Sequence, residues 1–188
     1  REVTRPLPVA GGWSHSAFVD AAGRLLTCGS AVEFEDGEML KQLGQGASVA
    51  EAPVPAAVVG LDGVRVASVA AGYAHTLALS ADGAVYSFGA GWAGALGHGD
   101  YENQHAARRV AALEGERVTA VACGNSFSLA LTDTGRAYSW GWGHAGPLGH
   151  GDFEDQPTPR RIEALAGIRV WAVAAGYDFC LALSDAGA

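Results

Sequence analysis

Short runs of apolar residues, separated by glycine turns, recur along this chain. His75–Ser80 and Ala84–Phe88 are runs of five or six residues rich in Leu, Val, Tyr and Phe, and Arg65–Ala70 alternates weakly. Asp82-Gly83 lies between the first two runs, and it signals a hairpin because glycine adopts positive φ at little cost. No segment keeps a helical period for more than about two turns. The pattern therefore predicts short antiparallel strands and little helix.

The pattern repeats every 52 residues. Val69–Asp100 reads VAAGYAHTLALSADGAVYSFGAGWAGALGHGD, and Val121–Asp152 reads VACGNSFSLALTDTGRAYSWGWGHAGPLGHGD, with no gap between the copies. Another copy begins at Val173, and a more divergent one begins at Val9, 60 residues before Val69, because it contains an insertion. A repeat of this length is one supersecondary unit that buries its apolar face by stacking on its neighbours. We place the units at about residues 9–68, 69–120, 121–172 and 173–188, the last of them incomplete.

Four short strands in each repeat are typical of a β-propeller blade. Small residues precede the glycine of each unit, as in Ala70-Ala71-Gly72, where strands converge near a propeller axis. The 188 residues end within a unit and do not begin with Met, which suggests an excerpt of a longer chain. We therefore expect residues 1–188 to form an all-β partial propeller of about three and a half blades, each of four antiparallel strands. Glu51–Gly60, which carries two prolines, is expected to be a loop leading into an edge strand.

Composition narrows the function. Hydrophobic residues make up 49% of the chain, which is enough for a substantial core, and the formal charge is -8. Such a charge disfavours a phosphate-binding surface, so direct nucleic-acid binding is not expected, whereas a basic partner or simple solubility fits it. Cys28, Cys123 and Cys180 lie in apolar runs without a CxxC pair, which predicts buried free thiols and an intracellular location, in cytoplasm or nucleus, with an organelle as the alternative. No apolar run reaches the ~18 residues of a membrane span.

The candidate chemical residues favour packing over catalysis. One repeat position holds His15 and His75 in two copies but Phe127 and Phe179 in the others, and phenylalanine cannot replace a catalytic or metal-binding histidine. The chain has neither a Gly-x-Ser-x-Gly elbow nor the Lys-Ser/Thr of a P-loop. We therefore expect no catalytic, cofactor-binding or metal-binding residue and no cofactor.

The pattern small-small-Gly-x-x-His-Ser/Thr, followed by alternating Leu and Ala, a glycine turn, a Tyr-Ser-Trp/Phe-Gly strand and Leu-Gly-x-Gly-Asp, resembles the regulator of chromosome condensation repeat. This resemblance implies a seven-bladed propeller in the complete protein. It also implies a choice of roles. Members of that family include a guanine-nucleotide exchange factor for the small GTPase Ran, a plant ultraviolet-B photoreceptor, ubiquitin-ligase subunits and scaffolds.

We expect a non-enzymatic protein-interaction or regulatory propeller. The first alternative is a guanine-nucleotide exchange factor for a Ran-like GTPase, and the second is a photoreceptor-like protein. Gly12-Trp13-Ser14-His15-Ser16 is similar to the photoreceptor's Gly-Trp-Arg-His-Thr motif but lacks its arginine. The positions equivalent to Trp13 hold Tyr73, Asn125 and Tyr177, so this segment offers one tryptophan where the photoreceptor has a cluster.

Loops at the blade ends are the expected contact sites for a protein partner, either a small GTPase or a basic protein. The first is an acidic insertion in the first unit, and the other two are the segments HGDYENQH and HGDFEDQP. Asp100 and Asp152 are expected to be turn formers whose carboxylates bond nearby amides. The candidate contact residues are Glu33, Glu35, Asp36, Glu38, His98, Asp100, Tyr101, His150, Asp152 and Phe153.

Overall fold

Within each sheet of the computed structural model, every strand pairs antiparallel with the next strand in sequence. The structure describes residues 8–31 and 42–185. The first sheet contains β1 (Val9–Gly11), β2 (His15–Val19), β3 (Leu25–Ser30) and β4 (Glu51–Ala57). The second contains β5 (Val66–Ala71), β6 (His75–Ser80), β7 (Val85–Gly89) and β8 (Gln104–Arg109). The third contains β9 (Val118–Cys123), β10 (Phe127–Thr132), β11 (Ala137–Gly141) and β12 (Gln156–Arg161). The described part of the fourth contains β13 (Val170–Ala175) and β14 (Cys180–Ser184).

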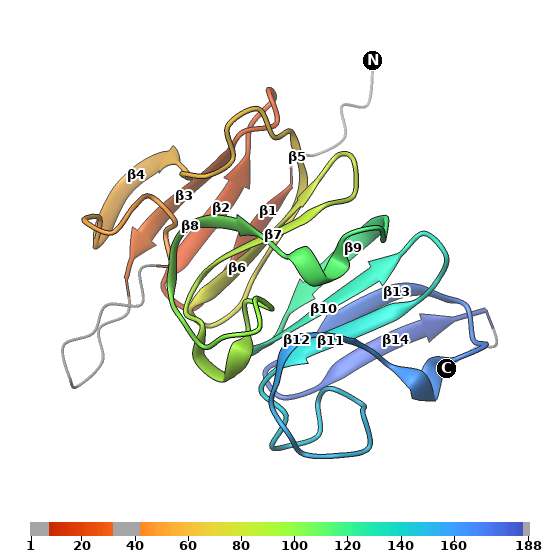
Figure 1. Cartoon of the computed structure of the whole chain (residues 1–188). Helices are drawn as coiled ribbons and strands as arrows, with labels where there is room; N and C mark the ends of the chain where they lie inside the picture. The colour runs from red at the N-terminus through yellow and green to blue at the C-terminus, as the bar shows by residue number, and fades with distance from the viewer. Residues whose placement is uncertain (1–7, 32–41, 186–188) are drawn as a thin grey trace.

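The sheets stand side by side as the blades of a partial propeller (Figure 1). Three of them have four strands and the last has two, so the all-β fold of about three and a half blades is confirmed. The described helical segments are three short 3-10 turns in the connections: η1 (Trp92–Gly94), η2 (Ala111–Leu113) and η3 (Glu163–Leu165).

The glycine turns lie where the sequence predicts them. The strand expected at His75–Ser80 has those bounds as β6, and the next one is shifted by one residue, to Val85–Gly89. Gly83 and Gly135 occupy the two hairpins with φ of 94° and 80°, a region that a side chain would disfavour. The spacing of strands follows from these turns.

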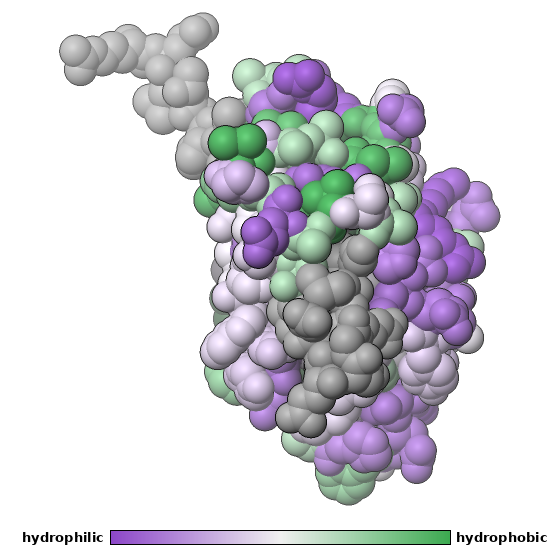
Figure 2. Space-filling model, turned by 90° about the vertical axis from the view of Figure 1, so that its left-hand side faces the viewer, coloured by the Kyte–Doolittle hydropathy of each residue, from purple (hydrophilic) through white to green (hydrophobic). Residues whose placement is uncertain are grey.

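The edge strand expected within Glu51–Gly60 is present as β4, but the loop expected at the start of the segment is not. Strand β4 already begins at Glu51 and contains Pro53 and Pro55. Proline is tolerated there because β4 is the last strand of its sheet, where outward-facing backbone groups have no ladder partner. Figure 2 looks onto this side of the molecule, where hydrophobic residues gather in the upper part and hydrophilic ones along the right-hand edge. The prolines protect the exposed edge from pairing with another strand.

Neighbouring sheets pack through their apolar faces. Phe88 of β7 lies in the cluster between the first and second sheets, and Trp140 of β11 lies in the cluster between the second and third. Phe127 and Leu129 are buried against β13 and β14 of the fourth sheet. The core is therefore distributed over the boundaries between sheets, one cluster at each.

The three cysteines are free, as expected, but each is partly rather than fully buried. Burial raises the pKa of Cys123 and, less strongly, that of Cys180. The Cys180 thiol donates a hydrogen bond to the carbonyl oxygen of Pro147, 3.0 Å away. A raised pKa keeps both thiols protonated and unreactive near neutral pH.

Candidate functional site

Two kinds of connection meet at one end of the sheets. The connections from first to second strand (residues 12–14, 72–74, 124–126 and 176–179) lie beside those from third to fourth strand (90–103 and 142–155). Backbone hydrogen bonds tie them together, from Ala90 N to Ala74 O at 2.8 Å and from Trp142 N to Ser126 O at 2.9 Å. We call this the aromatic end. The opposite end carries residues 58–65, 81–84, 110–117, 133–136 and 162–169.

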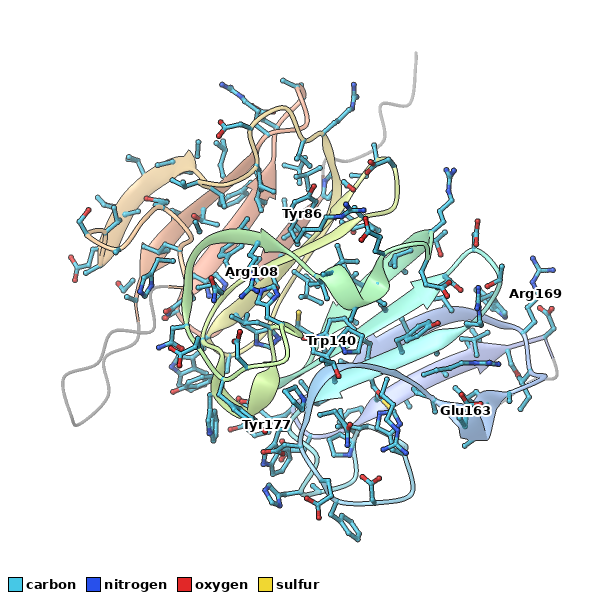
Figure 3. The ribbon with its side chains drawn as sticks, in the orientation of Figure 1. Tyr86, Arg108, Trp140, Glu163, Arg169 and Tyr177 are labelled. Carbon is cyan, nitrogen blue, oxygen red and sulfur yellow. The ribbon has the colours of Figure 1, made fainter. Side chains whose placement is uncertain are left out.

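Figure 3 separates the two ends. Tyr177 of the aromatic end lies in the lower middle of the view, whereas Glu163 and Arg169 of the opposite end lie at the right. Figure 1 shows the long connection between β11 and β12 at the bottom of the view.

His98 and His150, two of the candidate contact residues, point inward. His98 Nε2 lies 2.9 Å from Ser87 Oγ, and the Ser87 hydroxyl lies 2.7 Å from the carbonyl oxygen of Leu96. The Ser87 hydroxyl has a single proton, which it donates to the carbonyl oxygen of Leu96. The ring nitrogen of His98 is therefore the donor in its hydrogen bond with Ser87. Burial, together with the neighbouring Arg108, lowers the pKa of His98 to about 4. His150 repeats the arrangement with Ser139, at 3.0 Å.

Asp100 and Asp152 bind their own loops, which confirms the turn-forming role. Asp152 Oδ1 accepts a hydrogen bond from the amide of Glu154 at 3.2 Å, and Oδ2 pairs with Arg160 at 3.0 Å. The Arg160 hydrogen bond, and after it the amide, lowers the pKa of Asp152. Asp100 makes the same two contacts, with Glu102 N at 3.1 Å and Arg108 at 3.4 Å.

Hydrogen bonds between residues of the same loop hold each connection from third to fourth strand closed. Gly143 N donates to Asp155 Oδ1 at 2.8 Å, and Gly91 N donates to Asn103 Oδ1 at 2.9 Å. A Cβ added at Gly91 would overlap the carbonyl of Glu102 on the far side of its loop. These contacts hold each loop in one shape.

These fixed loops display aromatic side chains. Tyr101 is 58% exposed and Phe153, at the same repeat position, is 66% exposed. Each is followed by an exposed glutamate, Glu102 or Glu154. The remaining candidates, Glu33, Glu35, Asp36 and Glu38, lie outside the described residues. Contact between these loops and a partner stays a prediction.

A second set of residues at the aromatic end did not enter the predicted contact set. Trp13, Tyr73, Asn125 and Tyr177 each follow the glycine that ends the small run of their unit, and they line a cavity of about 270 Å³ beside the innermost strands. The rings of Trp13 and Tyr73 are 5.4 Å apart, centroid to centroid. Tyr73 N donates to Asn125 O at 3.0 Å, and Asn125 N donates to Tyr177 O at 2.9 Å. Their common repeat position is the signal that could have identified them.

His15 and His75 are buried, as expected for packing residues. Burial lowers the pKa of each ring to about 4. In residues 8–31 and 42–185, no group of three or more His, Cys, Asp or Glu side chains could hold a metal ion. In the same residues, no helix is long and apolar enough to cross a membrane.

Known proteins resemble this chain over most of its length. The mouse E3 ubiquitin-protein ligase HERC2 is 39% identical over 183 residues, which is 95% of this chain and 4% of HERC2. The ultraviolet-B receptor UVR8 of Arabidopsis thaliana is 41% identical over 124 residues, 65% of this chain and 28% of the receptor. The chain thus spans a small part of either relative.

Among solved structures, Prp20p of Saccharomyces cerevisiae matches with a TM-score of 0.79 at 26% identity, over 95% of this chain and 44% of Prp20p. A model of the regulator of chromosome condensation repeat matches residues 82–131 and 134–183, and a second model of that repeat matches 66–91 and 118–146. The two stretches of the first model cover more than half of the sequence. The chain belongs to the regulator of chromosome condensation repeat family.

Proposed function

We propose that this chain is a non-catalytic protein-interaction module that binds a basic protein through its aromatic end. The observation that carries the proposal is the pair of rigid loops that present Tyr101 and Phe153, each beside an exposed glutamate. Exposed aromatic side chains on fixed loops supply contact area at a low entropic cost, which is a common property of binding surfaces.

The charges of these loops favour a basic partner. The two third-to-fourth connections contain the carboxylates of Asp100, Glu102, Asp152, Glu154 and Asp155 and no lysine or arginine. The arginines closest to them, Arg108 and Arg160, are paired with Asp100 and Asp152. At the opposite end the charges are mixed, as in the pair of Arg136 and Glu116 at 2.9 Å. A negative surface of this kind steers positively charged proteins toward it.

A relative supports this choice. Prp20p has been described together with its binding properties to Gsp1p and histones, and histones are basic proteins.

Free, protonated thiols also fit our expectation of an intracellular location, in the cytoplasm or nucleus.

Titration calorimetry with purified core histones tests the proposal. The full-length protein should bind them, and the affinity should fall by about tenfold or more between 50 and 300 mM salt, values chosen to shorten the screening length from about 14 to 6 Å. A lack of binding at low salt, or binding that is indifferent to salt, would falsify the proposal of a basic partner.

A second candidate is an exchange factor for a small GTPase, which the structural match to Prp20p favours. Release of mant-GDP from Gsp1p in the presence of the full-length protein measures this activity directly, and an unchanged release rate removes it. The photoreceptor alternative has less support, since the ring that contacts Trp13 belongs to a tyrosine and no arginine is among the residues that line the cavity. A monomer–dimer change under ultraviolet-B light tests it.

A further inference from the structure

The cavity at the aromatic end has an unusual lining for a water-exposed surface. Trp13 is 70% exposed and Tyr177 is 62% exposed, because the cavity of about 270 Å³ that they line is shallow and widely open to solvent. The other lining residues are Tyr73, Asn125 and small residues of the innermost strands. Large aromatic faces left open in a concave place are typical of a binding site.

The lining is neutral and rich in π faces. None of the residues that line the cavity is a lysine, arginine or histidine, and Cys123 among them has a pKa raised by burial, so it stays an uncharged thiol. The faces of Trp and Tyr attract cations through their ring quadrupoles. Asn125 adds one polar, uncharged side chain to this lining.

The charges around the cavity also favour a cationic ligand. The exposed Asp178 directly follows Tyr177, and Glu102 and Glu154 are exposed at the same end. The whole chain has a formal charge of -8. A cation that enters the cavity therefore meets attractive rings within it and carboxylates around it.

The walls are held in place before any ligand binds. The backbone hydrogen bonds from Tyr73 to Asn125 and from Asn125 to Tyr177 join three successive sheets, and the rings of Trp13 and Tyr73 are in contact, with their planes tilted by 31°. A cavity with fixed walls loses little entropy on binding.

We propose that this cavity, lined by Trp13, Tyr73, Asn125 and Tyr177, receives an arginine side chain of the protein partner. Arginine fits better than lysine because its guanidinium is planar, stacks on aromatic rings and presents several N–H donors at once. The inference rests on the proposed function, since it identifies one anchor within the basic partner.

Binding of small probes tests the cavity by itself. N-acetyl-arginine methylamide, its neutral isostere N-acetyl-citrulline methylamide and the lysine analogue are titrated into the full-length protein, and the indole resonances are followed by NMR. The arginine probe should shift the Trp13 indole resonance saturably, at least about fivefold more tightly than either other probe. Equal affinity for citrulline or lysine, or shifts that spare Trp13, would overturn the assignment.

Variants then test whether the cavity binds the probe and the histones. Trp13→Ala and Tyr177→Ala should each reduce the affinity for both the arginine probe and the core histones by about fivefold or more. Trp171→Ala, at an exposed tryptophan outside both the lining and the loops of the aromatic end, is the matched control and should leave both affinities unchanged. Circular dichroism checks that each variant is folded.

The two proposals fail in distinguishable ways. Histone binding that is unaffected by Trp13→Ala and Tyr177→Ala overturns the arginine site and leaves the basic partner in place. A lack of histone binding, together with a saturable Trp13 shift by the arginine probe, overturns the basic partner and leaves the cavity as a guanidinium site.

Discussion

His75 Nε2 lies 3.0 Å from Ser128 Oγ, across the boundary between the second and third sheets. The Ser128 hydroxyl also lies 2.8 Å from the carbonyl oxygen of Ala95 and donates its proton there, so His75 is the donor in the pair. The first boundary repeats the arrangement with His15 and Thr76, 2.8 Å apart.

At the third boundary Phe127 replaces the histidine, and it packs in the same cluster as Cys180, which replaces the hydroxyl. The ring in one repeat is therefore matched to the side chain that it meets in the next repeat: histidine to a hydroxyl, phenylalanine to a thiol.

The buried histidine makes stability depend on pH. Burial, and to a smaller extent the charge of His15, lowers the pKa of His75 from 6.5 to about 4 in the folded protein. Between these values the unfolded chain binds more protons, so the free energy of unfolding falls as the pH decreases from 6.5 to about 4. We expect His75→Phe to remove on the order of 3 kcal/mol of this fall. Urea denaturation of both proteins across this range measures the difference.

The second substitution of the pair is the control. His75→Phe/Ser128→Cys reproduces the pair of Phe127 and Cys180, and it should be more stable at neutral pH than His75→Phe alone by about 1 kcal/mol, since no hydroxyl loses its partner. His15 and His98, whose pKa values are also lowered to about 4, keep their share of the pH dependence in both variants. A fall in the free energy of unfolding that is as large in both variants as in the unsubstituted protein would mean that His75 does not titrate with unfolding.

Gly72 has no room for a side chain. A Cβ there would overlap the ring of His75 and would lie 2.5 Å from the carbonyl oxygen of Gly124 in the next sheet. We expect Gly72→Ala to lower the free energy of unfolding by about 1–3 kcal/mol, as overpacked cores do. Gly11→Ala is the control, because no atom lies within 4 Å of a Cβ at that position. Thermal denaturation should show a lower Tm for Gly72→Ala only; equal losses would refute the steric explanation.

Trp140 links the third sheet to the second through a buried hydrogen bond. The indole is fully buried, and its Nε1 donates to the carbonyl oxygen of Ala95 at 2.9 Å. Phe88 occupies the equivalent position in the second sheet, so Trp140→Phe keeps an aromatic ring and loses the hydrogen bond and some volume. We expect a loss of about 1–3 kcal/mol in chemical denaturation. Trp171→Phe, at an exposed tryptophan, should cost less than about 0.5 kcal/mol.

The strands and their turns could be predicted from the sequence because both depend on local chemistry. Gly83 and Gly135 fix the hairpins, and the apolar runs on either side of them have the length of a strand. The edge strand expected within Glu51–Gly60 is present as β4, but its start was misplaced, since Pro53 and Pro55 suggest a loop at the beginning of the segment. The start of the strand depends on its pairing with β3, which no local pattern encodes.

The candidate site could be predicted only in part. Sequence reasoning singled out the loops that carry Tyr101 and Phe153, but it gave no orientation for His98 and His150, whose inward direction depends on serines of a neighbouring strand. The cavity lined by Trp13 and Tyr177 was missed because four residues of three different types come together only when successive sheets stack around it.

The most direct test of the account compares two charge reversals of equal size at opposite ends of the sheets. Glu102→Lys/Glu154→Lys changes two exposed glutamates of the aromatic end, and Asp62→Lys/Asp133→Lys changes two exposed aspartates of the opposite end. Titration calorimetry with core histones should show an affinity reduced by about tenfold or more for the first variant and little change for the second. Equal losses in both variants, or a loss only in the second, would contradict the assignment of binding to the aromatic end.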